Sequence, residues 1–127
     1  MVFEFSITVR GYEIDSYSHL NHAIYLNYME QARWEILRKL ELSNYFKENN
    51  FKLVVVDIHI RYAREAKIFD ELKIKTTLKK EEPYLLFTHK IYNIKTDLKI
   101  CQAEVKSLLI DNEKIPYDLP DEILTIK

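Results

Sequence analysis

The chain has 127 residues, of which 47% are hydrophobic and 31% are charged, which is enough apolar material for one folded core. Its 19 basic and 20 acidic residues give a formal net charge of -1, which excludes a strong overall attraction to nucleic acid or anionic membrane. The single glycine, Gly11, excludes glycine-rich phosphate loops, and the single cysteine, Cys101, excludes an internal disulfide. No run reaches the roughly 20 apolar residues that span a bilayer. We therefore expect one cytoplasmic domain over residues 1–127, without a membrane anchor.

The first two predicted elements are a strand and a long helix. Residues 2–10 alternate apolar and polar side chains, as a strand with one buried face does. Between residues 22 and 40 the apolar spacing changes to three and four, which is typical of an amphipathic helix. Asn21, or Ser18 one turn earlier, can supply the side-chain oxygen that caps the first free N-H groups of this helix.

The remaining segments predict further strands. Residues 43–50 (SNYFKENN) read as a polar break, and residues 53–62 then alternate again. One side of that strand is expected to carry Val54, Val56, Ile58, Ile60 and Tyr62. Residues 72–78 and 84–94 form a hairpin across the EEP break, and residues 98–110 form the last strand.

This order predicts an α+β fold, in which an antiparallel sheet of about five strands wraps around one long central helix. One helix covers only one face of such a sheet, so the other face or an edge needs a partner. We therefore expect a homo-oligomer.

Polar groups are concentrated between the first strand and the helix, in the segment YEIDSYSHLNHAIYLNYMEQAR. A helix N-terminus presents unpaired N-H groups and a partial positive charge, so it can polarise a carbonyl oxygen nearby. A carboxylate at the same place, Asp15, can attack an ester or thioester carbon or activate water. Capping of the helix is the simpler role for a lone acidic residue at such a position. The residues alone leave both roles open.

This segment resembles the signature of the hot-dog-fold thioesterases of the 4-hydroxybenzoyl-CoA thioesterase family. In that family an aspartate follows the first strand, a His-x-Asn segment leads into the central helix, and the helix carries Glu-x-Ala-Arg. The matching residues, without a gap, are Asp15, His19, Asn21, Tyr25, Leu26, Tyr28, Glu30, Ala32 and Arg33. The similarity is strongest over residues 9–38 and becomes a similarity of pattern alone over residues 84–127.

The resemblance implies roles for the residues of this segment. Asp15 is the implied catalytic carboxylate, either as a nucleophile or as a general base toward water. The implied donor to the thioester carbonyl is the backbone N-H of His22, at the start of the helix. His19 and Asn21 are the candidate substrate-binding residues of the matching segment. Tyr25 is a further candidate that could line an acyl pocket, although aromatic residues at core spacing more often belong to the core. No metal and no cofactor is implied.

The chain departs from the family pattern at two positions. Ser18 stands where the family usually has a glycine, and serine avoids the left-handed backbone region, so a different loop path is expected. Glu65 stands where the family often has a proline, which leaves the local edge geometry open.

Other polar residues are weaker candidates. Arg61 and Arg64 are candidates for the phosphates of CoA, although charges at such positions more often form a solvated edge. Glu30 is a second helix carboxylate, more often structural and expected to pair with Arg33 or Lys90.

We therefore expect an acyl-CoA thioesterase that releases free acid and CoA, with its active sites at the subunit interface of a homodimer or homotetramer. An acyl-carrier-protein thioesterase is the alternative within the enzyme class. A non-catalytic acyl-thioester-binding subunit is the alternative outside it, because fold alone does not decide function. The length of the acyl chain, its aliphatic or aromatic character, and the choice between dimer and tetramer stay open.

Overall fold

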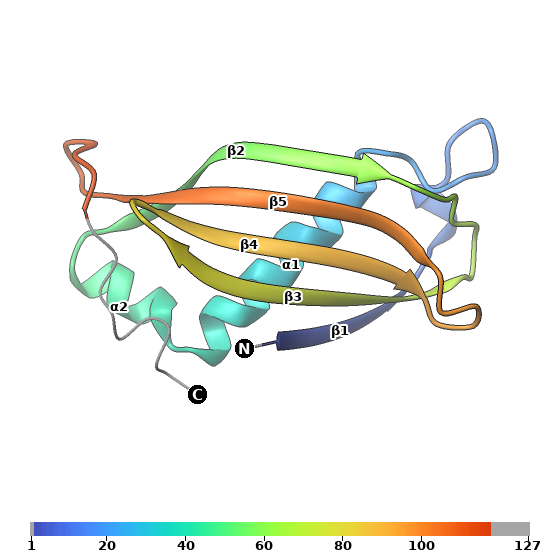
Figure 1. The fold of residues 1–127 in the computed structure, drawn as a ribbon, viewed down its shortest axis with the longest axis horizontal. Helices are drawn as coiled ribbons and strands as arrows, with labels where there is room; N and C mark the ends of the chain where they lie inside the picture. The colour runs from blue at the N-terminus through green and yellow to red at the C-terminus, as the bar shows by residue number, and fades with distance from the viewer. Residues whose placement is uncertain (1, 118–127) are drawn as a thin grey trace.

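The computed structural model describes residues 2–117, which form five strands, two α-helices and one short 3-10 helix (Figure 1). The elements follow the chain as β1 (Val2–Thr8), η1 (Gly11–Glu13), α1 (Ile24–Lys39), α2 (Leu42–Glu48), β2 (Lys52–Tyr62), β3 (Glu71–Glu81), β4 (Tyr84–Asn93) and β5 (Lys99–Ile110). The expected domain of residues 1–127 includes residues 118–127, which lie outside the described range.

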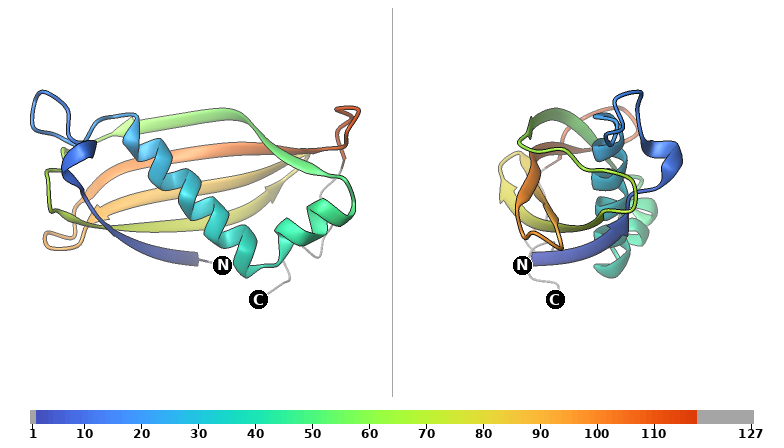
Figure 2. Two further views of the ribbon diagram at one scale, coloured as in Figure 1. Left: turned by 180° about the vertical axis from the view of Figure 1, so that it is seen from behind. Right: turned by 90° about the vertical axis from the view of Figure 1, so that its right-hand side faces the viewer.

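The strands form one antiparallel sheet in the order β1-β3-β4-β5-β2, which confirms the predicted α+β fold of five strands and a central helix. The sheet curves around α1, as the two views of Figure 2 show. Strands β1 and β2 are the two edges of the sheet, so each has one side without a strand neighbour.

Helix α1 packs on the concave face of the sheet because its apolar residues recur at spacings of three and four. Its buried residues are Tyr25, Tyr28, Met29, Ala32 and Ile36. They meet the inward-facing positions of β3, β4 and β5, where burial alternates along most of each strand. Full burial of such aliphatic and aromatic side chains contributes about 1.5–3 kcal/mol each.

Two sequence-based expectations about these elements are wrong. Residues 43–50 contain a helix rather than a polar break, because α2 buries Leu42 and Phe46 against the core. The inward side of β2 also changes along the strand. A register shift between Val55 and Asp57 places Val56 in a β-bulge.

The bulge reverses the alternation of β2 on either side of it. Before the bulge, Leu53 and Val55 pair with the inward-facing Leu109 and Ser107. After the bulge, the inward-facing positions are Ile58, Ile60 and Tyr62, opposite Val105, Ala103 and Cys101. Val54 therefore faces the outer side with Asp57, His59 and Arg61, contrary to the simple alternation of the sequence.

Candidate active site

Asp15 lies in a tight loop between η1 and α1, and its own loop holds its carboxylate. Asp15 Oδ1 accepts the backbone N-H groups of Tyr17 at 2.9 Å and of His19 at 3.2 Å. The backbone N-H of Asp15 in turn donates to the carbonyl of His19 at 2.9 Å. Within residues 2–117, no hydrogen-bond donor contacts Asp15 Oδ2. One carboxylate oxygen is thus fixed and the other is available to a ligand.

Ser18 adopts the left-handed conformation, with φ of 66°, so the expectation that serine would avoid this region is wrong. The N-H of Ser18 donates to the carbonyl of Asp15 at 3.1 Å, and this closes the loop. The hydrogen bonds that hold Asp15 therefore require a backbone conformation that costs a serine about 1–2 kcal/mol.

Glu13 anchors the start of this loop, a role that the sequence did not suggest. Its buried carboxylate accepts a hydrogen bond from the Tyr28 hydroxyl on α1 at 2.6 Å and from the Arg10 guanidinium at 3.0 Å and 3.2 Å. Burial alone raises the pKa of Glu13, but the hydrogen bonds from Arg10 and Tyr28 outweigh it and leave the pKa below its usual value. A charged Glu13 therefore ties the loop to the helix.

The first turn before α1 presents an unused backbone donor. Asn21 Oδ1 accepts the N-H of Ala23 at 3.0 Å, so Asn21 caps the turn that precedes the helix rather than the helix itself, whose N-cap is Ala23. The Tyr62 hydroxyl donates to the carbonyl of His22 at 2.7 Å. Within residues 2–117, no hydrogen-bond acceptor contacts the backbone N-H of His22. This N-H is thus free to bind a carbonyl oxygen.

The side chains of the remaining predicted residues point in different directions. The His22 ring is exposed and stands edge-on to Tyr62, with 6.5 Å between ring centroids. The His19 ring instead contacts Glu65, with Nε2 at 2.9 Å from Oε2. Tyr25 is buried in the core and its ring lies 5.4 Å from that of Tyr62. Where the family often has a proline, this chain thus has a glutamate, Glu65, whose carboxylate contacts His19.

The two candidate phosphate-binding arginines differ in their position relative to the Asp15 loop. Arg61 is on the outer side of β2 and lies 3.5 Å from Glu104. Arg64 follows β2 and donates to the carbonyl of Lys99 at 2.8 Å. Because Arg64 is next to Glu65, which contacts His19, it lies at the same end of the molecule as the Asp15 loop. Arg61 points to the opposite face of the sheet from α1.

Glu30 makes no ion pair with Arg33 or Lys90 in the described part of the chain, contrary to the expected pairing. Arg33 Nη1 instead lies 3.1 Å from Nε2 of His89, and His89 Nδ1 lies 2.7 Å from Thr76 Oγ1. Arginine can only donate, so Nε2 accepts and the neutral imidazole carries its proton on Nδ1. Burial, assisted by the charge of Arg33, lowers the pKa of His89 to about 3.

The arrangement combines a fixed carboxylate with a free backbone donor at the entry to a helix, which together can attack and polarise an acyl carbonyl. In the described range, no group of three or more His, Cys, Asp or Glu side chains lies close enough to hold a metal ion. No described helix has the length and apolar character needed to cross a membrane.

The sequence did not indicate the supporting roles of Glu13 and Tyr62. Glu13 is the last residue of the short 3-10 helix η1, where no periodic sequence pattern predicts that its side chain is buried. Tyr62 ends an alternating strand and looks like one more apolar position. Their partners, Tyr28 and the His22 carbonyl, come from α1 and the turn before it, so only the folded chain reveals these contacts.

Comparison with known proteins gives one family. The model of the Thioesterase-like superfamily matches residues 9–126. The long-chain acyl-CoA thioesterase FadM of Escherichia coli is 42% identical over 72 residues, which are 57% of this chain and 54% of FadM. The acyl-CoA thioesterase YbgC of Haemophilus influenzae is 29% identical over 125 residues, which are 95% of this chain and 90% of YbgC. The match to FadM thus spans about half the length of that relative.

Solved structures show the same architecture. The probable thioesterase YbaW of Escherichia coli superimposes with a TM-score of 0.88 at 28% identity and covers 98% of each chain. A 1,4-dihydroxy-2-naphthoyl-CoA thioesterase of Synechocystis has a TM-score of 0.88 at 18% identity, over 99% of this chain and 95% of that chain. The expected hot-dog fold is confirmed.

Proposed function

Because the chain belongs to the Thioesterase-like superfamily, we propose that it hydrolyses acyl-CoA thioesters to a free acid and CoA. The observation that carries the proposal is the state of Asp15. Its Oδ1 is fixed by two backbone N-H groups, whereas Oδ2 has no donor among residues 2–117. The names of the relatives FadM and YbgC support the choice of acyl-CoA as the substrate class.

In the proposed reaction, the thioester carbonyl oxygen accepts the free N-H of His22. This hydrogen bond makes the carbonyl carbon more electrophilic and stabilises the negative charge that develops on the oxygen. Asp15 Oδ2 either attacks this carbon to form an anhydride that water hydrolyses, or removes a proton from the attacking water. Both routes release CoA as the leaving thiol. The hydroxyl of Tyr62 holds the carbonyl of His22 and so keeps the N-H donor in place.

The proposal includes a second copy of the chain as a partner. Strand β2 is an edge whose exposed apolar residues include Val55, Val56 and Ile58, at 44%, 49% and 41% exposure. An apolar edge strand of 11 residues is an aggregation risk unless another strand covers it. Pairing of β2 with its copy would place the neighbouring Asp15 loops at a subunit interface, as the sequence analysis expects.

The roles of His19, Asn21, Tyr25, Arg61 and Arg64 in substrate binding stay predictions. His19 and Asn21 support the proposal by shaping the loop through their hydrogen bonds. Arg64 is the better placed of the two arginines for the phosphates of CoA, because it lies at the same end of the molecule as the Asp15 loop. We also propose a reducing, cytoplasmic setting for the protein. Burial raises the pKa of the Cys101 thiol to about 12, which keeps this thiol unreactive.

The test is Asp15→Asn, assayed by release of free CoA thiol from acyl-CoAs of several chain lengths. The amide keeps an Oδ1 acceptor for the N-H groups of Tyr17 and His19, so the loop is retained while the basic, nucleophilic oxygen is lost. We expect kcat/KM to fall at least about 100-fold. Asp97→Asn is the matched control, because Asp97 is an exposed carboxylate in the turn between β4 and β5, outside both the Asp15 loop and β2.

Two outcomes would contradict the proposal. Equal hydrolysis by wild type and Asp15→Asn would remove Asp15 from the chemistry. A wild type that binds acyl-CoA without hydrolysing it, and that is equally inert toward acyl-carrier-protein thioesters, would favour a binding subunit instead.

A further inference from the structure

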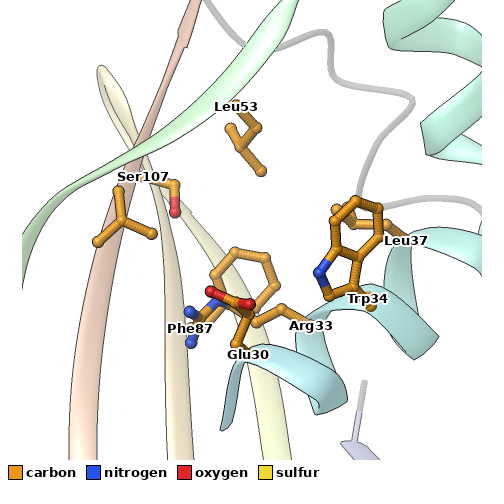
Figure 3. A pocket seen from close by; sticks show the side chains of 8 residues that line it. Glu30, Arg33, Trp34, Leu37, Leu53, Phe87 and Ser107 are labelled. Atoms are coloured by element: carbon orange, nitrogen blue, oxygen red, sulfur yellow. The ribbon is translucent and has the colours of Figure 1, made fainter. Parts of the chain in front are cut away.

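A cavity of about 240 Å³ lies between the middle of α1 and the concave face of the sheet (Figure 3). Helix α1 contributes Glu30, Arg33 and Trp34, and the strands contribute Leu53, Phe87 and Ser107. One water molecule needs about 10–15 Å³ of such space, so the cavity has room for several non-hydrogen atoms. None of these residues belongs to the Asp15 loop.

One wall of the cavity carries a hydroxyl that has no protein partner among the described residues. Ser107 is only 1% exposed, and its hydroxyl points into the cavity without a hydrogen bond to any residue from 2 to 117 (Figure 3). The Ser107 hydroxyl reaches the open space of the cavity, where a water molecule or a polar group of a ligand can bond to it.

Arg33 is a half-buried cation in the same cavity. Among residues 2–117 its polar contact is the neutral His89, and no carboxylate in that range lies within 4.0 Å of its guanidinium. Burial lowers the pKa of Arg33, and the nearby charge of Glu30 opposes this effect. Glu30 thus acts through space without forming an ion pair, and both groups stay available to a ligand.

These groups select the chemistry of the occupant. A purely apolar chain would leave the Ser107 hydroxyl without a partner and Arg33 with His89 alone, and a carboxylate would be repelled by Glu30. A hydroxyl group both accepts from Arg33 or Ser107 and donates to Glu30, and it brings no charge. Leu53 and Phe87 provide the apolar wall along which a hydrocarbon chain can lie.

The position of the cavity along α1 sets the length of the chain. Helix α1 rises about 9 Å between Ile24 and Glu30, and the turn from His22 to Ile24 adds about 3 Å, so the distance along the axis is about 12 Å. An extended chain advances about 3.5 Å for three bonds, so this distance needs roughly ten bonds. An acyl group of about ten carbons, bound by its thioester at His22, therefore reaches the cavity with its far end.

We propose that this cavity binds the hydroxyl-bearing end of an aliphatic acyl chain of about ten carbons. The inference rests on the proposed thioesterase function for the placement of the thioester, but its binding test does not depend on hydrolysis.

The first experiment measures kcat/KM for 10-hydroxydecanoyl-CoA and decanoyl-CoA. We expect the hydroxylated chain to be preferred about tenfold, the value of one good hydrogen bond. Its isomer 3-hydroxydecanoyl-CoA, whose hydroxyl lies near the thioester, should show no such preference. Ser107→Ala should reduce the ratio to within about twofold, whereas Ser6→Ala, an exposed strand serine of β1, should keep it.

The second experiment uses Trp34, the only tryptophan of the chain, whose fluorescence reports on the cavity that it lines. Titration with 10-hydroxydecanoate should shift the emission at lower concentration than decanoate, and Ser107→Ala should remove the difference. If thioesters are not hydrolysed but the fluorescence difference is present, the proposed function fails and the cavity assignment stands. Hydrolysis without preference for the hydroxylated chain, or Trp34 emission that neither acid changes, would overturn the assignment.

Discussion

Ser18 shows, at the scale of one residue, how a backbone angle supports the candidate site. The loop that fixes Asp15 Oδ1 passes through φ of 66° at Ser18, where a side chain is strained. The spacing of Asp15, His19 and Asn21 matches a family motif, so the sequence could single out these three residues as candidates. The strain was not readable, since a dihedral angle depends on the whole loop and not on the residue type.

Ser18→Gly should raise the free energy of unfolding by about 0.5 kcal/mol. Relief of the left-handed strain contributes about 1–2 kcal/mol, and the greater freedom of glycine in the unfolded chain offsets much of this gain. Urea denaturation followed by circular dichroism measures the change. Ser16→Gly, in the same loop but without a positive φ, should lower stability, and a loss of stability in Ser18→Gly would contradict the strain.

Strand β2 illustrates what sequence can predict about an element. Its existence and approximate ends, residues 53–62, agree with Lys52–Tyr62. Alternation did not predict which of its residues face α1, because the bulge at Val56 reverses the inward and outward positions along the strand. Helix α2 was missed for a related reason, since seven residues give too short a window for a helical period to stand out.

The exposed apolar edge of β2 predicts self-association through this strand. Val56→Lys should shift the assembly toward monomer at a given protein concentration, because a lysine on an edge strand opposes pairing with another strand. Analytical ultracentrifugation measures the molecular mass. Val2→Lys, an exposed position on the opposite edge strand β1, is the control and should leave the mass unchanged. A wild type that is monomeric throughout, or a Val56→Lys variant of unchanged mass, would remove β2 as the interface.

The stability of the whole molecule depends on pH through His89, which is neutral and lies between α1 and the sheet. Its pKa is lowered from 6.5 to about 3, so the unfolded chain takes up a proton at a pH where the folded chain does not. Stability should therefore be greatest above about pH 6.5 and should decline as the pH falls toward about 3, by several kcal/mol in total.

Urea denaturation at successive pH values tests this dependence. His89→Gln should weaken the decline between about pH 6.5 and 3, even if the variant is less stable at neutral pH, because the titrating group has been removed. His59→Gln, on the exposed outer side of β2, should retain the slope of the wild type. An unchanged slope in His89→Gln would assign the acid sensitivity to other groups.

The bulge at Val56 also divides one strand into two parts that can vary separately. Leu53 and Val55, before it, border the cavity at the middle of α1, whereas Tyr62, after it, holds the carbonyl of His22. If the cavity binds an acyl chain as proposed, substitutions in the first part should alter which chains fit without shifting the turn before α1. A family that diversifies its substrates while keeping its chemistry would benefit from this separation, which a single deletion of Val56 would abolish.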